Sequence, residues 1–218
     1  MGLWSNDCLK SRMREIRTYG SVRGSRQAFH CIYLKGVSRL STRLITMNEA
    51  LKNIMSRRSV KAYKPEMPSQ ELIDQVVEAG THAPTGMNRQ SPIIIEVTDK
   101  AVRDKLSKMN ADVMGAKIDP FYGAPVVLVV LADKSVGTYK YDGSLVMENL
   151  MLAANAVGLG SCWIHRAKEE FESEEGRELL RQLGISGDYE GIGHCILGYP
   201  TGDIPAEKPR KENWVYKI

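Results

Sequence analysis

Three cations and a hydroxyl fall within five residues of the chain, at Arg57-Arg58-Ser59-Val60-Lys61. A guanidinium has paired donors that match phosphate oxygens, and lysine adds a compact positive charge. Serine can donate one further hydrogen bond, so this spacing can bind a phosphate group. The alternative is a solvated charge run at a helix end, where cations are favoured by the helix dipole. The segment alone supports both interpretations equally.

A second run, residues 83–92 (APTGMNRQSP), combines small residues with side-chain amides between a predicted helix and a predicted strand. Such a loop can bring backbone N–H groups and the Asn88 amide close to a planar polar ring. Pro, Gly and Asn are also common turn formers. Taken alone, the run is better explained as a turn.

A third run, residues 158–165 (GLGSCWIH), follows a long apolar helix. Gly160 permits a close backbone approach, and the strand that follows can end at a ligand. We expect Cys162 and Trp163 to lie in the core, and the side chain of His165 to be a hydrogen-bonded structural histidine.

The polar tail, residues 200–218, contains a further basic run at Lys208-Pro209-Arg210-Lys211. Charge that keeps the protein in solution explains this run equally simply. The tail ends with Trp214 and Tyr216, two aromatic side chains that need a surface to pack against.

Several common catalytic signatures are absent from the sequence. Gly191-x-Gly193 lacks the third glycine of a dinucleotide-binding turn and leads into a strand instead of leaving one. No P-loop, G-x-S-x-G or H-E-x-x-H motif occurs, and the 4 histidines are scattered. A candidate phosphate-binding segment in a sequence without a nucleophile–base pair suits a protein whose bound cofactor carries out the chemistry itself. We therefore expect no catalytic side chain and no metal site.

Hydrophobic periodicity predicts helices over residues 48–56, 69–80, 99–109, 142–158 and 173–184, and strands over 92–98, 125–132, 160–165 and 193–199. We expect Gly80 and Gly184 to end their helices. Helices and strands do not alternate strictly, which favours an α+β domain with a mixed central sheet flanked by helices. The helix over 142–158 is apolar almost all round, and a second subunit can cover part of it.

The charge of the chain is unevenly distributed. Residues 1–46 contain nine Lys or Arg and two acids, a net charge of +7, so residues 47–218 carry −3 of the total of +4. The basic pI therefore gives no evidence of nucleic-acid binding by the folded part. We interpret 1–46 as a basic extension without a native role, because its apolar residues show no sustained period. An organellar transit peptide is the alternative.

The 4 cysteines form no C-x-x-C pair, which excludes the usual zinc and thioredoxin-like patterns. Cys162 and Cys195 lie in apolar runs typical of buried reduced thiols. No apolar run approaches the roughly 20 residues that span a bilayer. We therefore expect a cytoplasmic protein that binds neither membrane nor nucleic acid.

Taken together and in order, these runs resemble the FMN-dependent nitroreductase family over about residues 47–218. The family pattern is R-[RH]-S-x-[RK], then A-P-[ST]-x-x-N-x-Q-P, a buried helix ending in G-L-G, and a basic tail. No single piece is specific, but four pieces in the right order are. The sequence departs from the pattern in having Ser91 before Pro92, and it lacks the long helical insertion of some members, which helps shape the substrate side.

The resemblance implies a homodimer with two FMN sites at the subunit interface. It implies that Arg57, Ser59, Lys208 and Arg210 bind the phosphate, with Arg58 beside it and Lys61 near the pyrimidine side of the ring. It implies that Pro84, Thr85, Gly86 and Asn88 reach the flavin from the other subunit. The backbone at Ile164 and His165 would then approach the reactive nitrogen of the ring.

The implied activity is that of an NAD(P)H-dependent nitroreductase or flavin oxidoreductase. NADH or NADPH reduces the flavin at N5, and a nitroaromatic, quinone or free flavin then takes the electrons in a ping-pong cycle. The alternatives are a non-catalytic flavin-binding protein, a reductive dehalogenase or a flavin-fragmenting enzyme. The sequence does not distinguish NADH from NADPH and does not identify the physiological acceptor.

Overall fold

The computed structural model describes residues 48–218. The basic extension over residues 1–46, and Met47 as the first residue of the domain, lie outside the described residues.

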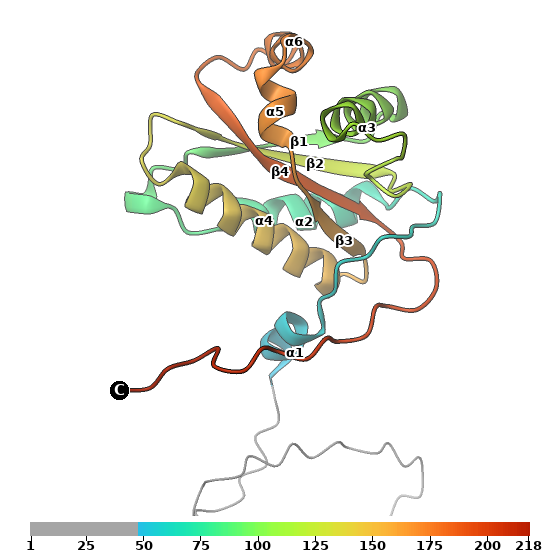
Figure 1. Cartoon of the computed structure of the whole chain (residues 1–218), viewed down its shortest axis with the longest axis vertical. Coiled ribbons are helices and arrows are strands. Elements are labelled where there is room, and N and C mark those ends of the chain that lie inside the picture. Colours follow the sequence, from blue (N-terminus) through green and yellow to red (C-terminus); the bar gives the residue numbers. More distant parts are fainter. Residues whose placement is uncertain (1–47) are drawn as a thin grey trace, which may run out of the picture. The chain divides into compact units, whose positions relative to one another are not determined.

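One four-stranded antiparallel sheet forms the centre of the domain, with strand order β1-β2-β4-β3 (Figure 1). The strands are β1 (Pro92–Val97), β2 (Val126–Asp133), β3 (Gly160–Ile164) and β4 (Tyr189–Gly198). The central strands β2 and β4 are buried over almost their whole length. A continuous run of Val and Leu suits this position, because successive side chains of a strand point to opposite faces and both faces here are covered.

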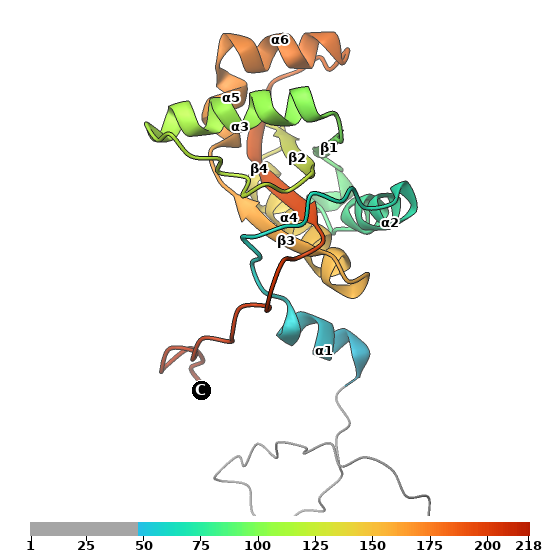
Figure 2. The same cartoon turned by 90° about the vertical axis from the view of Figure 1, so that its right-hand side faces the viewer.

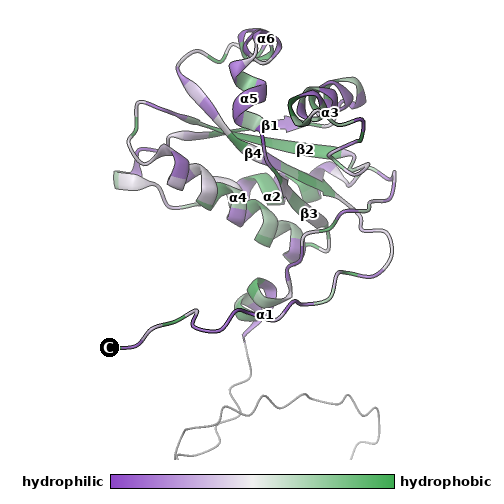
Figure 3. Ribbon diagram, viewed as in Figure 1, coloured by the Kyte–Doolittle hydropathy of each residue, from purple (hydrophilic) through white to green (hydrophobic). Residues whose placement is uncertain are grey.

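Helices cover both faces of the sheet (Figures 1 and 2). On one face lie α2 (Gln70–Thr81) and α4 (Tyr139–Ala156), and on the other lie α3 (Lys100–Met114), α5 (Ala167–Glu172) and α6 (Glu174–Gln182). Strand β2 contributes to both layers, since Leu128 and Val130 pack with α4 whereas Val127 and Val129 pack with α3. Figure 3 shows the resulting hydrophobic centre between more polar outer helix faces.

The first helix, α1 (Glu49–Ser56), packs against the C-terminal half of α4 through polar contacts. Asn53 Nδ2 donates to the carbonyl of Leu152 at 2.9 Å. Asn155 Nδ2 donates in turn to Asn53 Oδ1 at 2.6 Å. Asn48 caps α1 by accepting from the Leu51 N–H, so the predicted helix over 48–56 is confirmed.

The predicted α+β class, with helices flanking a central sheet, is confirmed. All pairings between the four strands are antiparallel. Among residues 48–218, parallel pairing occurs only in the isolated bridge between Ser59 and Ser161.

Two elements extend further than predicted. Helix α2 continues through Gly80 to Thr81, because this glycine serves packing: a Cβ there would lie 2.6 Å from Leu150 Cδ2. Strand β4 begins at Tyr189, four residues before the predicted start at Gly193. Within this stretch a Cβ on Gly191 would lie 2.3 Å from the backbone of α5. Helix α5 was not predicted. Helix α6 ends at Gln182 with Leu183 as its C-cap, and Gly184 follows with a φ of 70°, so the helix ends at this glycine as expected.

Cys162 and Cys195 are free and buried, as predicted. They lie on adjacent strands but one residue out of register, since Cys195 pairs with Trp163. Their side chains therefore belong to opposite layers of the core, which keeps the two thiols apart.

Within residues 48–218, no helix combines the length and the apolar composition needed to cross a bilayer. The same part of the chain has no group of His, Cys, Asp or Glu side chains that could bind a metal ion.

Asp119 holds together the loop that connects α3 to β2. Its carboxylate accepts from Arg103 Nη2 and Ser107 Oγ, both at 2.6 Å. It also accepts from the backbone N–H of Phe121 at 2.9 Å and of Gly123 at 2.7 Å. Partial burial opposes ionisation, but these hydrogen bonds outweigh it, and the pKa of Asp119 lies below its ordinary value.

We predict that Asp119→Asn lowers the free energy of unfolding by about 1–3 kcal/mol. Both carboxylate oxygens of Asp119 accept hydrogen bonds, and the NH2 group that replaces one of them in asparagine can only donate, so it faces another donor. The lowered pKa also makes a pH prediction. The stabilisation by ionised Asp119 is present above the ordinary aspartate pKa of about 3.9 and is lost as the pH falls through the folded-state pKa. The variant should therefore lose less stability than wild type over that acidic range.

Urea denaturation from pH 7 down to pH values below about 3.9 measures both effects. Asp112→Asn is the matched control, since Asp112 is an exposed carboxylate paired only with Lys108. An Asp119→Asn protein with wild-type stability and a wild-type acid response would contradict the prediction.

Candidate functional site

The basic segment after α1 lies along the edge of the sheet, beside β3. Ser59 and Ser161 form a parallel bridge, in which the Val60 N–H donates to the Ser161 carbonyl at 2.9 Å. The buried Val60 side chain packs on Gly160, where a Cβ would lie 3.0 Å from Val60. The close approach expected at Gly160 is therefore present, and it brings the first and third runs of the sequence together.

A pocket of about 390 Å³ opens where these segments meet. Its lining includes four predicted site residues, Ser59, Lys61, Ile164 and His165. The rest of the lining consists of Asn110, Met114, Ile118, Pro120, Tyr122, Cys162, Trp163 and Arg166. A volume of several hundred Å³ is ordinary for a small-molecule site. The pocket is bounded by the 59–61 segment, the end of β3, helix α3 and the loop that Asp119 holds.

The turn between β3 and α5 forms one wall of this pocket. Arg166 has a φ of 78°, a left-handed conformation that is unusual for a residue other than glycine. The His165 carbonyl accepts from Asn110 Nδ2 at 2.8 Å. The backbone N–H groups of His165 and Arg166 donate to no acceptor within residues 48–218, so both donors are available to a ligand.

The side chain of His165 is exposed, so the prediction of a structural histidine at this position is wrong. The buried histidine is His194 on β4, which is 0% exposed. The strand ends at Ile164, and His165 already belongs to the turn.

Arg57 and Arg58 have different surroundings although they are adjacent. Arg57 Nη1 is buried and has no hydrogen-bond partner in the described chain, and Arg57 Nε lies 3.9 Å from Glu148 Oε1. Arg58 Nη1 donates to the carbonyls of Met55 and Arg57, at 2.6 and 2.9 Å. Arg58 also pairs with Glu207 at 3.3 Å. The donors of Arg58 are thus used within the chain, whereas Arg57 keeps a donor at Nη1 that is free within residues 48–218.

The tail returns to the same region. Tyr63 and Pro200 form an antiparallel bridge, and the Thr201 N–H donates to the Ala62 carbonyl at 3.0 Å. The Arg58–Glu207 ion pair extends the contact further along the tail.

Beyond this contact the tail is exposed. Lys208 and Arg210 both face solvent, and Arg210 lies 3.9 Å from Glu207. Trp214 and Tyr216 are also exposed, so residues 48–218 do not supply the surface that they need.

The loop over residues 83–92 is anchored on the N-terminal end of α4 by the buried Asp142. This carboxylate accepts from the Gly86 N–H at 3.0 Å, from Ser91 Oγ at 3.0 Å and from Thr138 Oγ1 at 2.9 Å. Glycine is required at position 86, since a Cβ there would lie 2.4 Å from Thr138 Oγ1. Two residues later in the same loop, Asn88 adopts a left-handed conformation with a φ of 54°.

The loop and the pocket are separated within one copy of the chain. The loop contacts α4 at Asp142, whereas α1, which leads into Arg57, contacts α4 at Leu152. Ten residues of helix rise by about 15 Å, and Figure 1 shows α1 near the C-terminal end of α4. Pro84, Thr85, Gly86 and Asn88 are accordingly not among the residues that line the pocket.

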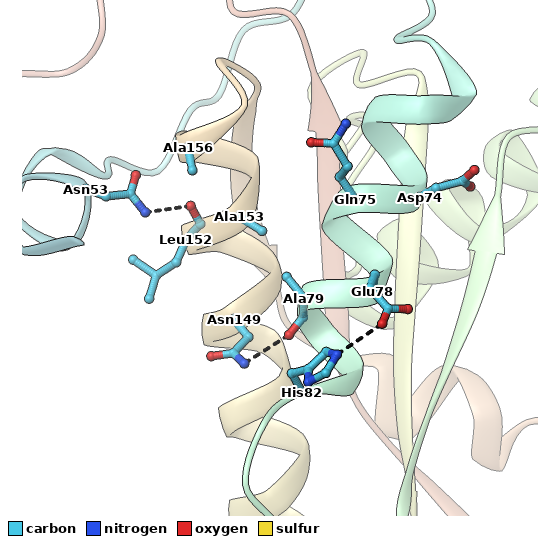
Figure 4. A pocket seen from close by; sticks show the side chains of 10 residues that line it. All are labelled: Asn53, Asp74, Gln75, Glu78, Ala79, His82, Asn149, Leu152, Ala153 and Ala156. Atoms are coloured by element: carbon cyan, nitrogen blue, oxygen red, sulfur yellow. Dashed lines mark hydrogen bonds and ion pairs between the residues drawn. The ribbon is translucent and has the colours of Figure 1, made fainter. Parts of the chain in front are cut away.

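A larger groove of about 870 Å³ runs between α1, α2 and α4 and contains none of the predicted site residues (Figure 4). Polar side chains of its lining are already paired with neighbouring groups. Asn149 Nδ2 donates to the Ala79 carbonyl at 3.0 Å, and the His82 and Glu78 side chains lie 3.0 Å apart. The groove carries no convergent set of chemistry-bearing groups, so the smaller pocket is the better candidate for the functional site.

The pocket is electrostatically positive and contains no activated nucleophile. Its charged lining residues are Lys61 and Arg166, and none of the lining residues is a carboxylate. Burial raises the pKa of the Cys162 thiol, although a hydrogen bond from Ser59 and the charge of Lys61 oppose the shift. The thiol is therefore protonated near neutral pH, and the site suits binding of an anionic ligand better than covalent catalysis.

Asn110 and Asp142 are the site-region residues that the sequence did not identify. Asn110 lies in the middle of α3, and Asp142 is the acidic residue in the first turn of α4. An acid in the first turn of a helix is common because it interacts favourably with the helix dipole, so Asp142 carries no specific signal in the sequence. Nothing in the sequence around Asn110 marks it either. Only their burial and contacts in the folded chain distinguish them.

Comparison with known proteins adds independent evidence. Residues 54–199 match the model of the nitroreductase family. A protein of Archaeoglobus fulgidus, provisionally named NADH dehydrogenase/NAD(P)H nitroreductase, is 34% identical over 162 residues, 72% of this chain and 88% of its own. The FMN reductase [NAD(P)H] of Bacillus subtilis is 28% identical over 181 residues, covering 75% of this chain and 70% of that protein.

Solved structures agree with the sequence matches. The nitroreductase with bound FMN from Bacteroides fragilis has a TM-score of 0.73 and 25% identity, covering 79% of this chain and 100% of its own. The nitroreductase with bound FMN from Desulfitobacterium hafniense has a TM-score of 0.71 and 29% identity, with the same coverage of 79% and 100%. Because the family model spans most of the chain and agrees with the observed fold, this protein belongs to the nitroreductase family.

Proposed function

We propose that this protein is an FMN-dependent oxidoreductase that passes electrons from NADH or NADPH to nitroaromatic, quinone or flavin acceptors. The observation that carries the proposal is the pocket in which Ser59 and Lys61 meet the end of β3 at Ile164 and His165. The FMN named in the related B. fragilis and D. hafniense structures, and the name of the B. subtilis FMN reductase, support FMN as the ligand.

The residues present fit the phosphate of FMN. Arg57 has a buried guanidinium nitrogen, Nη1, without a hydrogen-bond partner in the described residues, and a buried donor is costly unless an acceptor meets it. Ser59 lies two residues away and can donate from its hydroxyl. We assign the phosphate to Arg57 and Ser59, with Arg58 holding the adjacent backbone. Lys208 and Arg210 add charge from the tail, which the Arg58–Glu207 pair already ties to this region.

Arg57, Arg58, Lys208 and Arg210 do not line the pocket itself, whereas the residues that do line it fit the flavin ring. Lys61 would place a positive charge near the pyrimidine side, where reduction of the ring develops negative charge. The free N–H groups after Ile164 can donate to ring atoms, and His165 contributes backbone, not its exposed side chain. FMN, when bound, would take a hydride at N5 and pass the electrons on in a ping-pong cycle. The chain itself positions the ring and needs no catalytic acid or base.

We infer that two copies of the chain complete each site. Pro84, Thr85, Gly86 and Asn88 then approach the flavin from the second subunit, which fits their absence from the lining of the pocket in their own chain. A homodimer also accounts for exposed apolar side chains, since Leu145 on α4 is 44% exposed and Trp214 in the tail is 67% exposed.

The buried free thiols are consistent with a reducing cytoplasmic compartment, and we propose that location.

The test of function is an absorption spectrum of the purified protein, followed by NADH and NADPH oxidation with a nitroaromatic, a quinone or free FMN as acceptor. We expect a flavin spectrum and acceptor-dependent turnover. A flavin spectrum without NAD(P)H oxidation would favour the non-catalytic flavin-binding alternative. Halide release from a halogenated aromatic, or loss of the flavin itself, would favour a dehalogenase or a flavin-fragmenting enzyme. A colourless protein that takes up no added FMN would refute the proposal.

We predict that Arg57→Ala weakens FMN binding by about tenfold to a hundredfold, because each charged hydrogen bond contributes roughly 1.5–3 kcal/mol. Quenching of FMN fluorescence during titration measures the dissociation constant. Arg177→Ala is the control, since Arg177 is an exposed arginine on α6 paired with Glu174. If Arg57→Ala kept its yellow colour through dialysis as wild type does, the assignment of Arg57 to the phosphate would be wrong.

We predict that wild type is a dimer and that Leu145→Glu shifts it toward monomer while also weakening FMN binding. A charge on this exposed face of α4 must be buried without a partner when two copies meet. Light scattering after size-exclusion chromatography gives the mass, and the same FMN titration gives the affinity. The control is Leu183→Glu, at an exposed leucine that caps α6 on the opposite layer. A wild-type monomer that binds FMN tightly would contradict the two-subunit site.

A further inference from the structure

Three polar side chains meet in the mainly apolar layer between the sheet and helices α3 and α5. Asn110, Glu170 and His194 are 0%, 1% and 0% exposed. His194 Nε2 lies 3.2 Å from Glu170 Oε2, and Asn110 Nδ2 donates to Glu170 Oε1. The His194 ring packs on Phe121, with the ring centroids 5.1 Å apart.

Stability alone does not explain this cluster. A carboxylate without access to water carries a large desolvation cost, and apolar replacements of buried ion pairs are often neutral or stabilising. The cluster is also incompletely satisfied, because Asn110 Oδ1, Glu170 Oε2 and both ring nitrogens of His194 lack a hydrogen-bond partner with good geometry. Buried polar groups in so unfavourable an arrangement tend to mark functional regions.

Asn110 connects the cluster to the pocket. The same Nδ2 that donates to Glu170 also donates to the His165 carbonyl at 2.8 Å. Because both the Glu170 carboxylate and the His165 carbonyl accept hydrogen bonds, the end of the Asn110 side-chain amide that faces them must be the NH2 group. Glu170 therefore determines how the Asn110 side chain is oriented. Asn110, His165 and Arg166 all line the pocket.

Glu170 is tied to the turn a second time through its own helix. Its backbone N–H donates to the Arg166 carbonyl at 3.1 Å in the first turn of α5. Arg166 holds a left-handed φ of 78°, a conformation that costs roughly 1–2 kcal/mol for a residue other than glycine. The surrounding contacts must therefore maintain it. The cluster therefore contacts both residues of the turn, His165 through its carbonyl and Arg166 through its carbonyl, and these are the residues whose N–H groups are free.

We infer that Glu170, buried against His194, is a positioning residue for the electron-transfer site. Through Asn110 it fixes the backbone of His165 and Arg166, so that their free N–H groups are presented to the ring of a bound flavin. This inference rests on the proposed binding of FMN in the pocket. N–H donors that are fixed in advance stabilise the negative charge of the reduced ring more than mobile donors do.

The test compares Glu170→Gln with Glu190→Gln in the FMN-loaded protein. Glu190 is a matched control, because it is also buried, lies on β4 itself, and pairs with Lys140 at 3.1 Å outside the pocket lining. For Glu170→Gln we expect a lower flavin midpoint potential and about a tenfold slower reduction by NAD(P)H in stopped flow. The FMN dissociation constant should change by less than about threefold, because the phosphate contacts are untouched. Glu190→Gln should match wild type in all three.

Asn110→Leu provides a second variant that retains side-chain volume and removes the donor to His165. It should reproduce the effects of Glu170→Gln, and the double variant should add nothing, since both changes act through one contact. If Glu170→Gln does not fold, Asn110→Leu alone decides the question. Altered melting temperatures with wild-type midpoint potentials and reduction rates would show a structural role only, and would overturn the inference.

Backbone 15N relaxation of His165 and Arg166 in the FMN-free protein gives a readout that does not depend on the flavin, because it reports motion of N–H groups that have no acceptor in the described chain. Order parameters that fall in Glu170→Gln and stay unchanged in Glu190→Gln support positioning of the turn, and unchanged order parameters in both overturn it. A wild-type protein that binds no FMN would refute the proposed function, and this relaxation measurement would still show whether the cluster holds the turn. The two failures are therefore distinguishable.

Discussion

Strands β2 and β4 have no face in contact with water, and this double burial organises the rest of the domain. Two apolar faces require two helical layers, so α2 and α4 cover one side and α3, α5 and α6 cover the other. Covering a sheet on both faces leaves its edges as the places where backbone donors and acceptors remain available. The edge at β3 is where the basic segment pairs through Ser59 and Ser161.

The pocket is a direct consequence of that edge. Once the 59–61 segment lies along β3, the end of the strand, the turn into α5 and the loop held by Asp119 surround a concave space. Its charges are cationic, and its free backbone donors are adjacent N–H groups, so both features favour a ligand that carries or develops negative charge. Backbone geometry and fixed charge, with no reactive side chain, give the site its chemical character.

Two sets of buried polar residues each organise a short backbone segment of this domain. Asp142 organises the loop over residues 83–92, and the Asn110–Glu170–His194 cluster organises the turn at His165. Each takes a charge or a histidine into the interior to fix a short backbone segment that has positive φ angles. Such segments do not hold their conformation by local propensity, so tertiary contacts must supply what the local sequence lacks.

The sequence alone determined the fold class, most of the elements and the chemistry of the basic segment. Hydrophobic periodicity depends on neighbours along the chain, which is why the strand over 125–132 and the helix over 142–158 were found close to their observed bounds. It ended α2 one residue early, at Gly80, and began β4 four residues late, and in both stretches a glycine (Gly80 and Gly191) serves close packing with a distant element. The sequence cannot distinguish a glycine that serves packing from one that ends an element.

The tertiary structure alone decided which chemical groups meet. Ser59 and His165 line one pocket although more than a hundred residues separate them, whereas the loop around Gly86 is held elsewhere on the same chain. Only the fold distinguishes Arg57, with a buried free donor, from Arg58, which is occupied by Glu207. The physical reason is that burial and hydrogen-bond partnership depend on contacts between distant residues. Local composition fixes which groups the chain carries, and packing fixes which of them remain free to bind.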